Sequence, residues 1–406
     1  MRASVISIGH ELLMGKTLNR HLVTIARSLK GIGISIDHAY IIKDDPEAIK
    51  AELSHIHDDV LIFTGGLGPT PDDLTKETVC DFFQIPLVLH EPSLEAIKAQ
   101  FKRYEKPMSD SNLKQAYFPS QATVLGNPQG TAPGAIFKTP TDQWVVLLPG
   151  PPVELNPMLP KVKDFFQTTF NETMYEDGFL VAGIGESEME ERLKGLYAQF
   201  PDVYIAPYAG NGEIQYFFTA SDQTQLKKAM QAFKTRAEDY IVGPYQTTFE
   251  ALLIKRLSDL NETIAVAESM TAGMVSARLT DIPGASKVLK ESIIVYSDAS
   301  KIKYLGIDPK LLEEKTAVSL EVATAMVEGL HAQTGADLCG AITGYAGPGA
   351  DEDSPVGTVF MAVKYQGITT TRKVTLQGNR SFIRERTTAY LLHMLLKRVM
   401  DHGRND

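Results

Sequence analysis

The sequence predicts an α/β protein of three domains. Its 406 residues suffice for two or three domains of ordinary size. In the first and third parts of the chain, short apolar runs alternate with amphipathic runs of helical spacing, which is typical of sheets covered by helices. The middle part instead shows alternating strands and a long helix, and indicates a small α+β domain. We expect domains at residues 1–170, 171–248 and 249–406.

The first part follows the order strand, helix, strand. Apolar runs of strand length occupy residues 3–8, 34–42 and 60–64, and runs with helical spacing occupy residues 18–29 and 46–57. Strands that are separated by helices pair in parallel, so we expect a parallel sheet covered on both faces. Such folds bind ligands beyond the carboxyl ends of their strands.

The middle and third parts continue with different patterns. In the middle part, alternating residues predict strands at 203–206 and 213–220, and helical spacing predicts a helix at 223–237. No catalytic cluster is visible there, and we interpret this part as a spacer or packing domain. The third part begins with a helix at 251–260 and returns to alternating strands and helices, with a strand at 263–266.

Composition limits the possible functions. The hydrophobic fraction of 43% and charged fraction of 22% are typical of folded domains, and the net charge of −10 disfavours binding to nucleic acid or to a membrane surface. Cys80 and Cys339 are too few for a disulfide framework or a zinc cluster. Because we see no signal-peptide pattern and no apolar run of membrane-spanning length, we expect a cytoplasmic protein.

Three glycine-rich loops of the first part follow predicted strands, at residues 64–75, 127–134 and 147–154. Glycine lets the backbone approach a phosphate closely, and neighbouring carboxylates suit Mg²⁺. The loops, Glu11 and Asp44 together predict one crevice that contains several acids. The segment 9–17 is similar to a P-loop, but five residues separate its glycines instead of four and it carries an acid, so we do not expect a P-loop there.

A serine in the third part lies on a turn between a predicted strand and a predicted helix. The turn is Ala267-Glu268-Ser269-Met270-Thr271-Ala272-Gly273, and the helix occupies residues 274–280. A nucleophile for acyl transfer suits this place, because backbone N–H groups point outward at the start of a helix. An ordinary helix cap also favours serine there. Taken alone, the turn leaves both interpretations open.

The motifs of the first part, taken together, resemble the N-terminal domain of the CinA family. They are Gly9-x-Glu11-Leu12-Leu13, Gly65-Gly66-Leu67-Gly68-Pro69-Thr70-x-Asp72-Asp73-x-Thr75, Gly130-Thr131-Ala132-Pro133-Gly134 and Pro149-Gly150-x-Pro152-x-Glu154. That domain is similar to the molybdopterin-binding fold, which implies a three-layer α/β/α architecture. The resemblance also implies an ADP-ribose pyrophosphatase that depends on a divalent metal, Mg²⁺ or Co²⁺.

The same resemblance implies roles for single residues. Asp44 and Asp73 would act as metal ligands or bases, because related molybdopterin enzymes use aspartates at matching places. The implied metal ligands are Glu11, Asp44, Asp72, Asp73 and Glu154. The implied substrate contacts are Gly65, Gly66, Gly68, Thr70, Asn127, Gly130, Thr131 and Gly134. His10 stands where the family pattern has Asp or Thr, so one charge is missing at the rim.

The third part resembles the CinA C-terminal domain, the PncC-type nicotinamide mononucleotide deamidase family, through the serine turn and three later segments at 296–301, 343–349 and 378–386. In the turn, Met270 replaces the usual Cys and Ala272 replaces a Gly. The resemblance implies that Ser269 attacks the carboxamide, that Lys301 accepts its proton and that Tyr296 relays or orients that proton, without a cofactor. The N–H groups of Thr271 and Ala272 would hold the oxyanion, and Arg380 and Arg384 would bind the phosphate. The implied substrate contacts of this part are Thr271, Ala272, Gly273, Thr343, Gly344, Gly347, Arg380 and Arg384.

The resemblance therefore implies a bifunctional hydrolase of pyridine-nucleotide salvage, which would be a homodimer and act on nicotinamide mononucleotide and ADP-ribose. Two other functions stay open. The N-terminal domain would bind molybdopterin or a nucleotide without turnover, or the chain would have a non-enzymatic role in competence or DNA damage with a degenerate deamidase domain. Ammonia release and ADP-ribose cleavage distinguish the enzyme from both.

Overall fold

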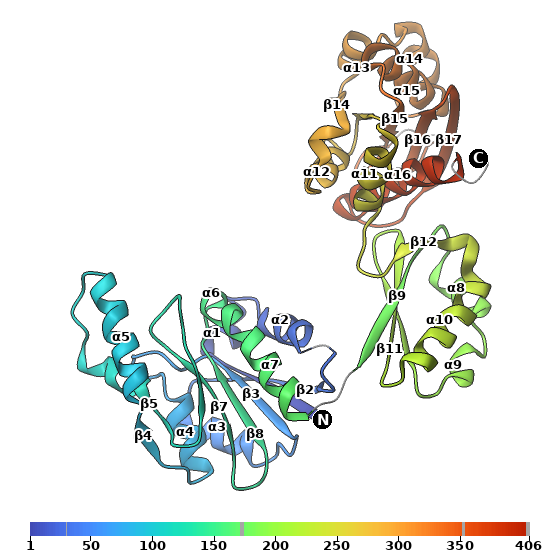
Figure 1. Ribbon diagram of the computed structural model, residues 1–406. Coiled ribbons are helices and arrows are strands. Elements are labelled where there is room, and N and C mark those ends of the chain that lie inside the picture. Colours follow the sequence, from blue (N-terminus) through green and yellow to red (C-terminus); the bar gives the residue numbers. More distant parts are fainter. Residues whose placement is uncertain (30, 171–173, 351–353, 403–406) are drawn as a thin grey trace. The chain divides into compact units, whose positions relative to one another are not determined.

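The computed structural model describes the chain except residues 30, 171–173, 351–353 and 403–406 (Figure 1). The chain divides into two compact units, Met1–Tyr175 and Glu176–Asp406. The predicted boundary at 170/171 adjoins residues that lie outside the described part, and the predicted boundary at 248/249 falls within the second unit. These domain limits stay a prediction.

The first unit contains a six-stranded sheet. Across the sheet, the strands are β2 (Ser35–Ile42), β1 (Arg2–Ile8), β3 (Val60–Thr64), β8 (Trp144–Leu148), β7 (Gly134–Lys138) and β6 (Thr123–Leu125). The first four pair in parallel, as predicted, whereas β7 pairs antiparallel with β8, and β6 pairs antiparallel with β7. The strands β7 and β6, which are not among the strands predicted above, make the sheet mixed, because the turn at residues 139–143 between β7 and β8 is too short for a crossover. A separate pair is formed by β4 (Leu87–Leu89) and β5 (Tyr117–Pro119).

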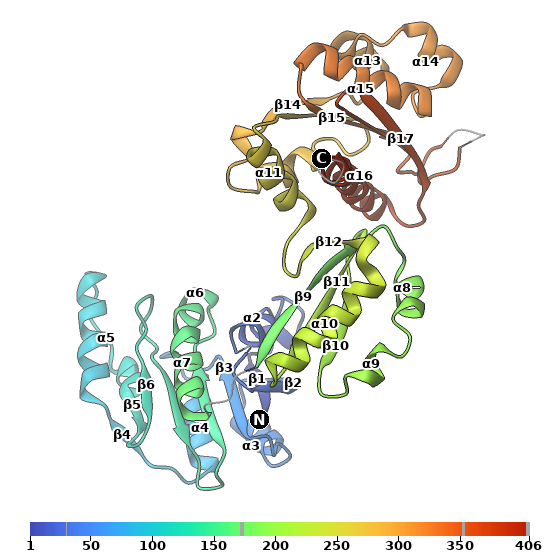
Figure 2. The same cartoon turned by 45° about the vertical axis from the view of Figure 1, so that its right-hand side comes forward.

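Helices cover both faces of this sheet, which confirms the three-layer fold (Figures 1 and 2). Alternate strand residues enter two cores: Leu61 and Phe63 pack in the core with α3 and α4, and Val60 and Ile62 pack in the core with α2 and α7. The α-helices are α1 (His10–Leu13), α2 (His21–Ser28), α3 (Pro46–Leu53), α4 (Thr75–Phe82), α5 (Glu91–Arg103), α6 (Pro152–Leu155) and α7 (Leu159–Phe170). Two 3₁₀ helices are η1 (Asp110–Ala116) and η2 (Asn156–Met158).

A buried carboxylate joins the amino ends of the parallel strands. Asp58 accepts hydrogen bonds from the Ser4 hydroxyl at 2.5 Å and from His38 Nδ1 at 2.8 Å, and Arg2 Nε lies 3.8 Å away. Burial opposes ionisation of Asp58, but these hydrogen bonds and charges outweigh it and hold its pKa below the ordinary 3.8. The ionised form is therefore favoured by folding.

We expect Asp58 to make folding sensitive to acid. Because its pKa is lower in the folded state, its contribution is complete above pH 3.8 and disappears as the pH falls through the lower folded value. Asp58→Asn should cost roughly 1–3 kcal/mol at pH 7 and flatten the loss of stability at low pH. Urea unfolding between pH 3 and pH 7 measures both; equal acid slopes in the two proteins would contradict the assignment.

The second unit begins with a four-stranded sheet backed by helices, the predicted small α+β domain. Its strands, in order across the sheet, are β10 (Tyr204–Ala209), β11 (Glu213–Ala220), β9 (Tyr175–Ala182) and β12 (Ile241–Pro244). Its helices are α8 (Glu186–Arg192), α9 (Leu196–Gln199), α10 (Gln223–Ala237) and η3 (Glu238–Tyr240). Leu180 and Ala182 of β9 enter the same core as α11 and α16 of the following sheet. The two sheets therefore belong to one packed unit.

The rest of the second unit contains a five-stranded sheet. Its strands, in order, are β14 (Leu289–Ile294), β13 (Ile264–Glu268), β15 (Leu338–Gly344), β16 (Thr358–Tyr365) and β17 (Ile368–Thr375). β14, β13 and β15 pair in parallel, whereas β16 pairs antiparallel with both β15 and β17, so this sheet too is mixed. Gln366 and Gly367 join β16 to β17 with positive φ at both residues, the geometry of a tight hairpin.

Helices also cover both faces of the five-stranded sheet. Val266 packs in the core with α11, α12 and α16, and its neighbours Ala265 and Ala267 pack in the core with α13, α14 and α15. The helices are α11 (Phe249–Leu260), α12 (Met274–Thr280), η4 (Ala285–Lys287), α13 (Asp298–Leu305), α14 (Pro309–Lys315), α15 (Leu320–Thr334) and α16 (Arg380–His402). In the described part of the chain, no helix has both the length and the apolar character needed to cross a membrane.

Candidate functional site

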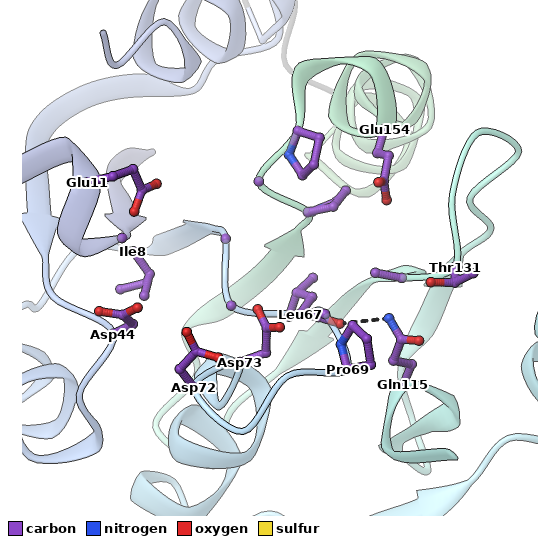
Figure 3. Close-up of a pocket in the computed structure, with 18 residues that line it drawn as sticks. Ile8, Glu11, Asp44, Leu67, Pro69, Asp72, Asp73, Gln115, Thr131 and Glu154 are labelled. Carbon is purple, nitrogen blue, oxygen red and sulfur yellow. Dashed lines mark hydrogen bonds between the residues drawn. The ribbon is translucent and has the colours of Figure 1, made fainter. Parts of the chain in front are cut away.

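A crevice of about 390 Å³ opens in the first unit at the carboxyl ends of β1, β2, β3 and β8 (Figure 3). Parallel strands end at the same edge of a sheet, so the loops that follow them meet there. The crevice brings together nine of the predicted residues: Glu11, Asp44, Gly65, Gly66, Gly68, Asp72, Asp73, Thr131 and Glu154. In Figure 3, Asp72 and Asp73 lie beside each other, Glu11 and Asp44 lie near Ile8, and Glu154 lies on the opposite side.

The four other residues predicted for this site support its walls instead of lining the crevice. The backbone N–H of Thr70 donates to Asp73 Oδ2 at 3.0 Å, and its hydroxyl donates to the same oxygen. Asn127 Nδ2 donates to Glu154 Oε2 at 2.6 Å. The backbone N–H of Gly130 donates to Asn127 Oδ1 at 2.9 Å. Gly134 lies in β7, where a Cβ would come within 2.6 Å of the Leu147 carbonyl.

The loop after β3 needs glycine because neighbouring atoms occupy the side-chain space. Gly65 has a φ of +96°, and a Cβ there would lie 2.4 Å from the Ile8 carbonyl oxygen. At Gly66, with a φ of +67°, a Cβ would lie 2.0 Å from Thr75 Oγ1. These contacts let the loop pass close to the end of β1, which forms the floor of the crevice. Among the described residues, the buried Thr75 hydroxyl has no hydrogen-bond partner.

Three side chains, Lys76, Lys114 and Gln115, form a clamp that holds the same loop, and Gln115 also lines the crevice. Lys114 Nζ donates to the carbonyls of Thr70 at 2.6 Å and Asp73 at 2.8 Å. Gln115 Nε2 donates to the Leu67 carbonyl at 3.2 Å, and Lys76 Nζ donates to the Lys114 carbonyl at 2.7 Å. Sequence reasoning missed this clamp, because its residues form no recognisable motif and Lys114 and Gln115 lie about 40 positions from the loop they hold.

The carboxylates of the crevice suit a metal ion whose coordination is completed by oxygens of a bound ligand. In the part of the chain that the structure describes, no three His, Cys, Asp or Glu side chains gather closely enough to hold a metal ion by themselves. Mg²⁺ commonly takes one or two carboxylates and completes its coordination with substrate oxygens and water. Asp72, Asp73 and Asp44 offer such oxygens, and the many negative charges would repel a diphosphate unless a cation entered with it.

The Ser269 turn follows β13 in the second unit, and a buried carboxylate holds it. Glu268 is fully buried, and its carboxylate accepts from the N–H groups of Gly273 at 3.0 Å, Val275 at 3.1 Å and Ser276 at 2.9 Å. The Ser276 hydroxyl donates to it as well. Since Glu268 satisfies the first N–H groups of α12, whose N-cap is Gly273, Ser269 is not the helix cap.

Arg384 holds the turn from the other side. Its Nε donates to the Met270 carbonyl at 2.9 Å, and its Nη2 donates to the Thr271 carbonyl at 2.9 Å. This arginine from α16 is therefore engaged with the backbone of the turn. Arg380, one turn earlier, donates from Nη1 to the Gly347 carbonyl at 2.6 Å and from Nη2 to the Tyr296 hydroxyl at 3.1 Å. Arg380 thus joins two of the predicted segments and stays exposed.

Lys301 and Tyr296 follow β14, the strand beside β13. Glu268 pairs with Ile294, and the Val295 N–H donates to the Glu268 carbonyl at 2.8 Å, so Tyr296 and Ser269 follow adjacent strand ends. Lys301 is only 1% exposed, and its Nζ lies 3.4 Å from Asp298 Oδ1. Burial lowers the pKa of Lys301, against the opposing charge of Asp298.

The predicted residues at the end of β15 support the turn by packing. A Cβ at Gly344 would lie 2.5 Å from the Met270 sulfur and 2.9 Å from the Thr358 carbonyl. The Thr343 hydroxyl donates to the Ala317 carbonyl at 2.7 Å. Glycine at 344 therefore lets β15 lie directly against the turn.

The two predicted oxyanion donors, the N–H groups of Thr271 and Ala272, differ in their hydrogen bonding. The Ala272 N–H donates to the Ser269 carbonyl at 3.1 Å, so it is already engaged. Within the described residues, the Thr271 N–H donates to no acceptor. Ala272 has a φ of +49° and Gly273 a φ of +94°, so both lie in the left-handed region. The alanine that replaces a family glycine occupies a backbone position that favours glycine.

We expect Ala272→Gly to stabilise the second unit by about 1 kcal/mol, because a left-handed alanine carries a steric cost of about 1–2 kcal/mol. Ala277→Gly is the matched control, since Ala277 lies inside α12 and the change there should destabilise by about 1 kcal/mol. Urea unfolding of the two variants measures the difference. Equal destabilisation by both would mean that position 272 carries no strain.

Comparisons with known proteins cover almost the whole chain. Family models match residues 4–168 (probable molybdopterin binding domain), 179–243 (damage-inducible protein CinA KH domain) and 246–399 (CinA C-terminal domain). A CinA-like protein of Dictyoglomus turgidum is 38% identical over 411 residues, covering 99% of this chain and 100% of the relative. A relative from Alkaliphilus oremlandii, whose name refers to competence-damage induction, is 39% identical over 417 residues, covering 99% of this chain and 100% of the relative.

Solved structures similar to part of the chain include two CinA-type proteins. A competence or damage-inducible protein from Enterobacter asburiae is 32% identical with a TM-score of 0.37, covering 38% of this chain and 99% of that one. The protein CinA from Thermoplasma acidophilum is 32% identical with a TM-score of 0.37, covering 41% of this chain and 97% of that one.

Proposed function

Because the chain belongs to the CinA family, we propose that it is a hydrolase of pyridine nucleotides with two separate active sites. The second unit would deamidate nicotinamide mononucleotide, and the first would cleave ADP-ribose. The observation that carries the deamidation is the Ser269 turn, which Glu268 and Arg384 hold from two sides. A buried lysine, Lys301, follows the adjacent strand.

In the proposed deamidation, Ser269 Oγ attacks the carboxamide carbon while the neutral amine of Lys301 takes the hydroxyl proton. The developing oxyanion would accept from the Thr271 N–H, and one such donor is worth roughly 3 kcal/mol. Collapse breaks the C–N bond, and the departing nitrogen takes the proton from Lys301, so ammonia leaves an acyl ester on Ser269. Water then hydrolyses this ester to nicotinate mononucleotide and restores the serine.

Substrate orientation would come from Arg380 and Tyr296. The guanidinium of Arg380 is exposed, carries a full positive charge and lies beside the Gly347 loop and the Tyr296 hydroxyl. Guanidinium matches phosphate oxygens in a bidentate geometry, so Arg380 would bind the phosphate. Arg384 would act instead as a positioning residue for the turn, since its donors already bind two carbonyls of that turn.

The lowered pKa of Lys301 predicts how deamidation depends on pH. Only the neutral amine accepts the serine proton, so kcat/KM should rise with pH until it passes the depressed pKa of Lys301 and then level off. Lys301→Met keeps the apolar volume, should fold normally and should lose more than about tenfold in kcat/KM at pH 7. The pH profiles of both proteins measure this. A profile of the same shape in Lys301→Met would assign the titration to another group.

The second proposed activity belongs to the crevice of the first unit. Glycines 65 and 66 would let the backbone approach the diphosphate, and Asp44, Asp72 and Asp73 would hold a divalent cation beside it. When bound, such a cation withdraws charge from the phosphate oxygens and lowers the pKa of water. An aspartate of the crevice would take the proton as water attacks one phosphorus, and the P–O–P bond breaks to give AMP and ribose 5-phosphate.

Two assays on the full chain test these activities. Incubation with nicotinamide mononucleotide should release ammonia and an equal amount of nicotinate mononucleotide, and incubation with ADP-ribose and Mg²⁺ or Co²⁺ should yield AMP. Because each substrate belongs to one proposed active site, turnover of one substrate serves as the control when the other is not turned over. If either substrate raises the melting temperature but gives no product under any of these metals, that site binds without turnover.

A further inference from the structure

A second crevice, of about 360 Å³, lies inside the second unit, where the four-stranded sheet faces β17 and α16. Residues 183–186, 188, 209–210 and 212–214 line one wall, and the other is lined by Arg372 of β17 with Arg386, Tyr390 and His393 of α16. We call it the junction crevice. No residue assigned above to either reaction lines it, so neither proposed activity accounts for it.

The wall from α16 and β17 is basic. Arg386 Nε donates to the Tyr390 hydroxyl at 3.1 Å, and the Arg372 guanidinium lies 5.2 Å from the centre of the Tyr390 ring. In the described part of the chain, neither arginine forms an ion pair with a carboxylate. Both guanidinium groups therefore retain donors for an anion. His393 is buried, and its burial lowers its pKa to about 4, so it lines the crevice as a neutral ring at pH 7.

The opposite wall is acidic. Among the described residues, the buried Oε2 atom of Glu213 has no hydrogen-bond partner, and burial raises the pKa of this carboxyl. Glu186 and Glu188 also line this wall, and Glu188 pairs with Arg192 at 3.5 Å. A buried carboxylate oxygen without a donor is costly, so a ligand that donates to Glu213 would recover that cost.

The two walls of the junction crevice are in contact at the rim but not across the interior. A rim contact joins them, since Asn211 Nδ2 donates to Glu385 Oε2 at 3.2 Å. Next to it, Gly212 leaves room for the Tyr390 ring, from which a Cβ would be only 3.0 Å away. Across the interior, the described residues show no ion pair between the arginines and the glutamates. The arginines of one wall and the glutamates of the other are therefore separated by a space large enough for a small molecule.

We propose that the junction crevice binds a phosphate monoester with hydroxyl or amine donors at its other end, such as a nucleoside monophosphate. Arg372 and Arg386 would hold the phosphate, because guanidinium and phosphate match in a bidentate geometry. Glu213 would accept from a ribose hydroxyl, as carboxylates do in nucleotide sites. The volume suits a ligand of this size.

Calorimetric titration of the full chain with AMP, ribose 5-phosphate and inorganic phosphate tests this site. We expect AMP to bind the wild type, and Arg372→Gln and Arg386→Gln each to weaken that binding at least tenfold. Arg372 is exposed on β17, so its variant should fold normally even if Arg386→Gln disturbs α16. Glu213→Ala should weaken binding of AMP at least fivefold and leave binding of inorganic phosphate unchanged.

Because AMP could also enter the two proposed active sites, Asp44→Asn and Arg380→Gln are titrated in parallel. Binding that survives these two changes and fails in Arg372→Gln belongs to the junction crevice. The proposal is overturned if AMP binds Arg372→Gln and Arg386→Gln as tightly as the wild type, or if none of the three probes binds at millimolar concentration. It is also overturned if inorganic phosphate binds as tightly as AMP. None of these results depends on catalytic turnover.

Discussion

Ser269→Ala will lower the rate of ammonia release from nicotinamide mononucleotide by at least ~10⁴-fold, because it removes the only atom proposed to attack the carboxamide. In the described residues the Ser269 hydroxyl forms no hydrogen bond within the protein; Glu268 and Arg384 hold the backbone of the turn. The variant should therefore keep its melting temperature, and the loss should appear in kcat. Steady-state ammonia assays and thermal unfolding measure the two quantities.

Ser286→Ala is the matched control for this change, since Ser286 is an exposed serine in the same unit. It should leave the rate unchanged. Ammonia release by Ser269→Ala at a rate near that of the wild type would refute the serine mechanism. A parallel loss of activity and melting temperature would instead mean that Ser269 is needed for folding of the turn.

Asp44→Asn will reduce ADP-ribose cleavage by at least ~100-fold and raise the Mg²⁺ concentration needed for half-maximal rate, because it removes one charge from the proposed cation site. Asp44 lines the crevice of the first unit and is half-buried. It is a cleaner test than Asp73, whose carboxylate also accepts from the Thr70 backbone. The amide keeps the size of the side chain, so the melting temperature should stay the same.

The neighbouring Asp45 provides a control with the opposite expected effect, on stability instead of on rate. Asp45 caps α3 by accepting from the Ala48 N–H at 2.9 Å, and it does not line the crevice. Asp45→Ala should therefore cost about 1 kcal/mol of stability and keep the cleavage rate. Metal titrations of both variants with ADP-ribose measure the contrast. An Asp44→Asn enzyme with unchanged rate and metal dependence would remove Asp44 from the site.

Local patterns predicted most elements within a few residues, since alternating and helical spacing report which face of a segment is buried. The strand at 60–64 and the helices at 223–237 and 274–280 match the structure at both ends. The helix predicted at 46–57 ends at Leu53, where the Ser54 hydroxyl donates to the Ala51 carbonyl. Strand direction was less predictable, because it depends on the length and geometry of connections that carry no periodic signal.

By itself, the sequence determined the order of the loops that carry chemistry, because each glycine-rich loop or serine turn is a local signal directly after a strand. Only the tertiary structure decided what those loops contact. Arg384 binds the Ser269 turn across 114 positions, Lys114 holds the Thr70 carbonyl across 44, and folding buries Lys301 to 1% exposure. Hydrogen bonds and pKa values depend on neighbours in space, which local patterns do not specify.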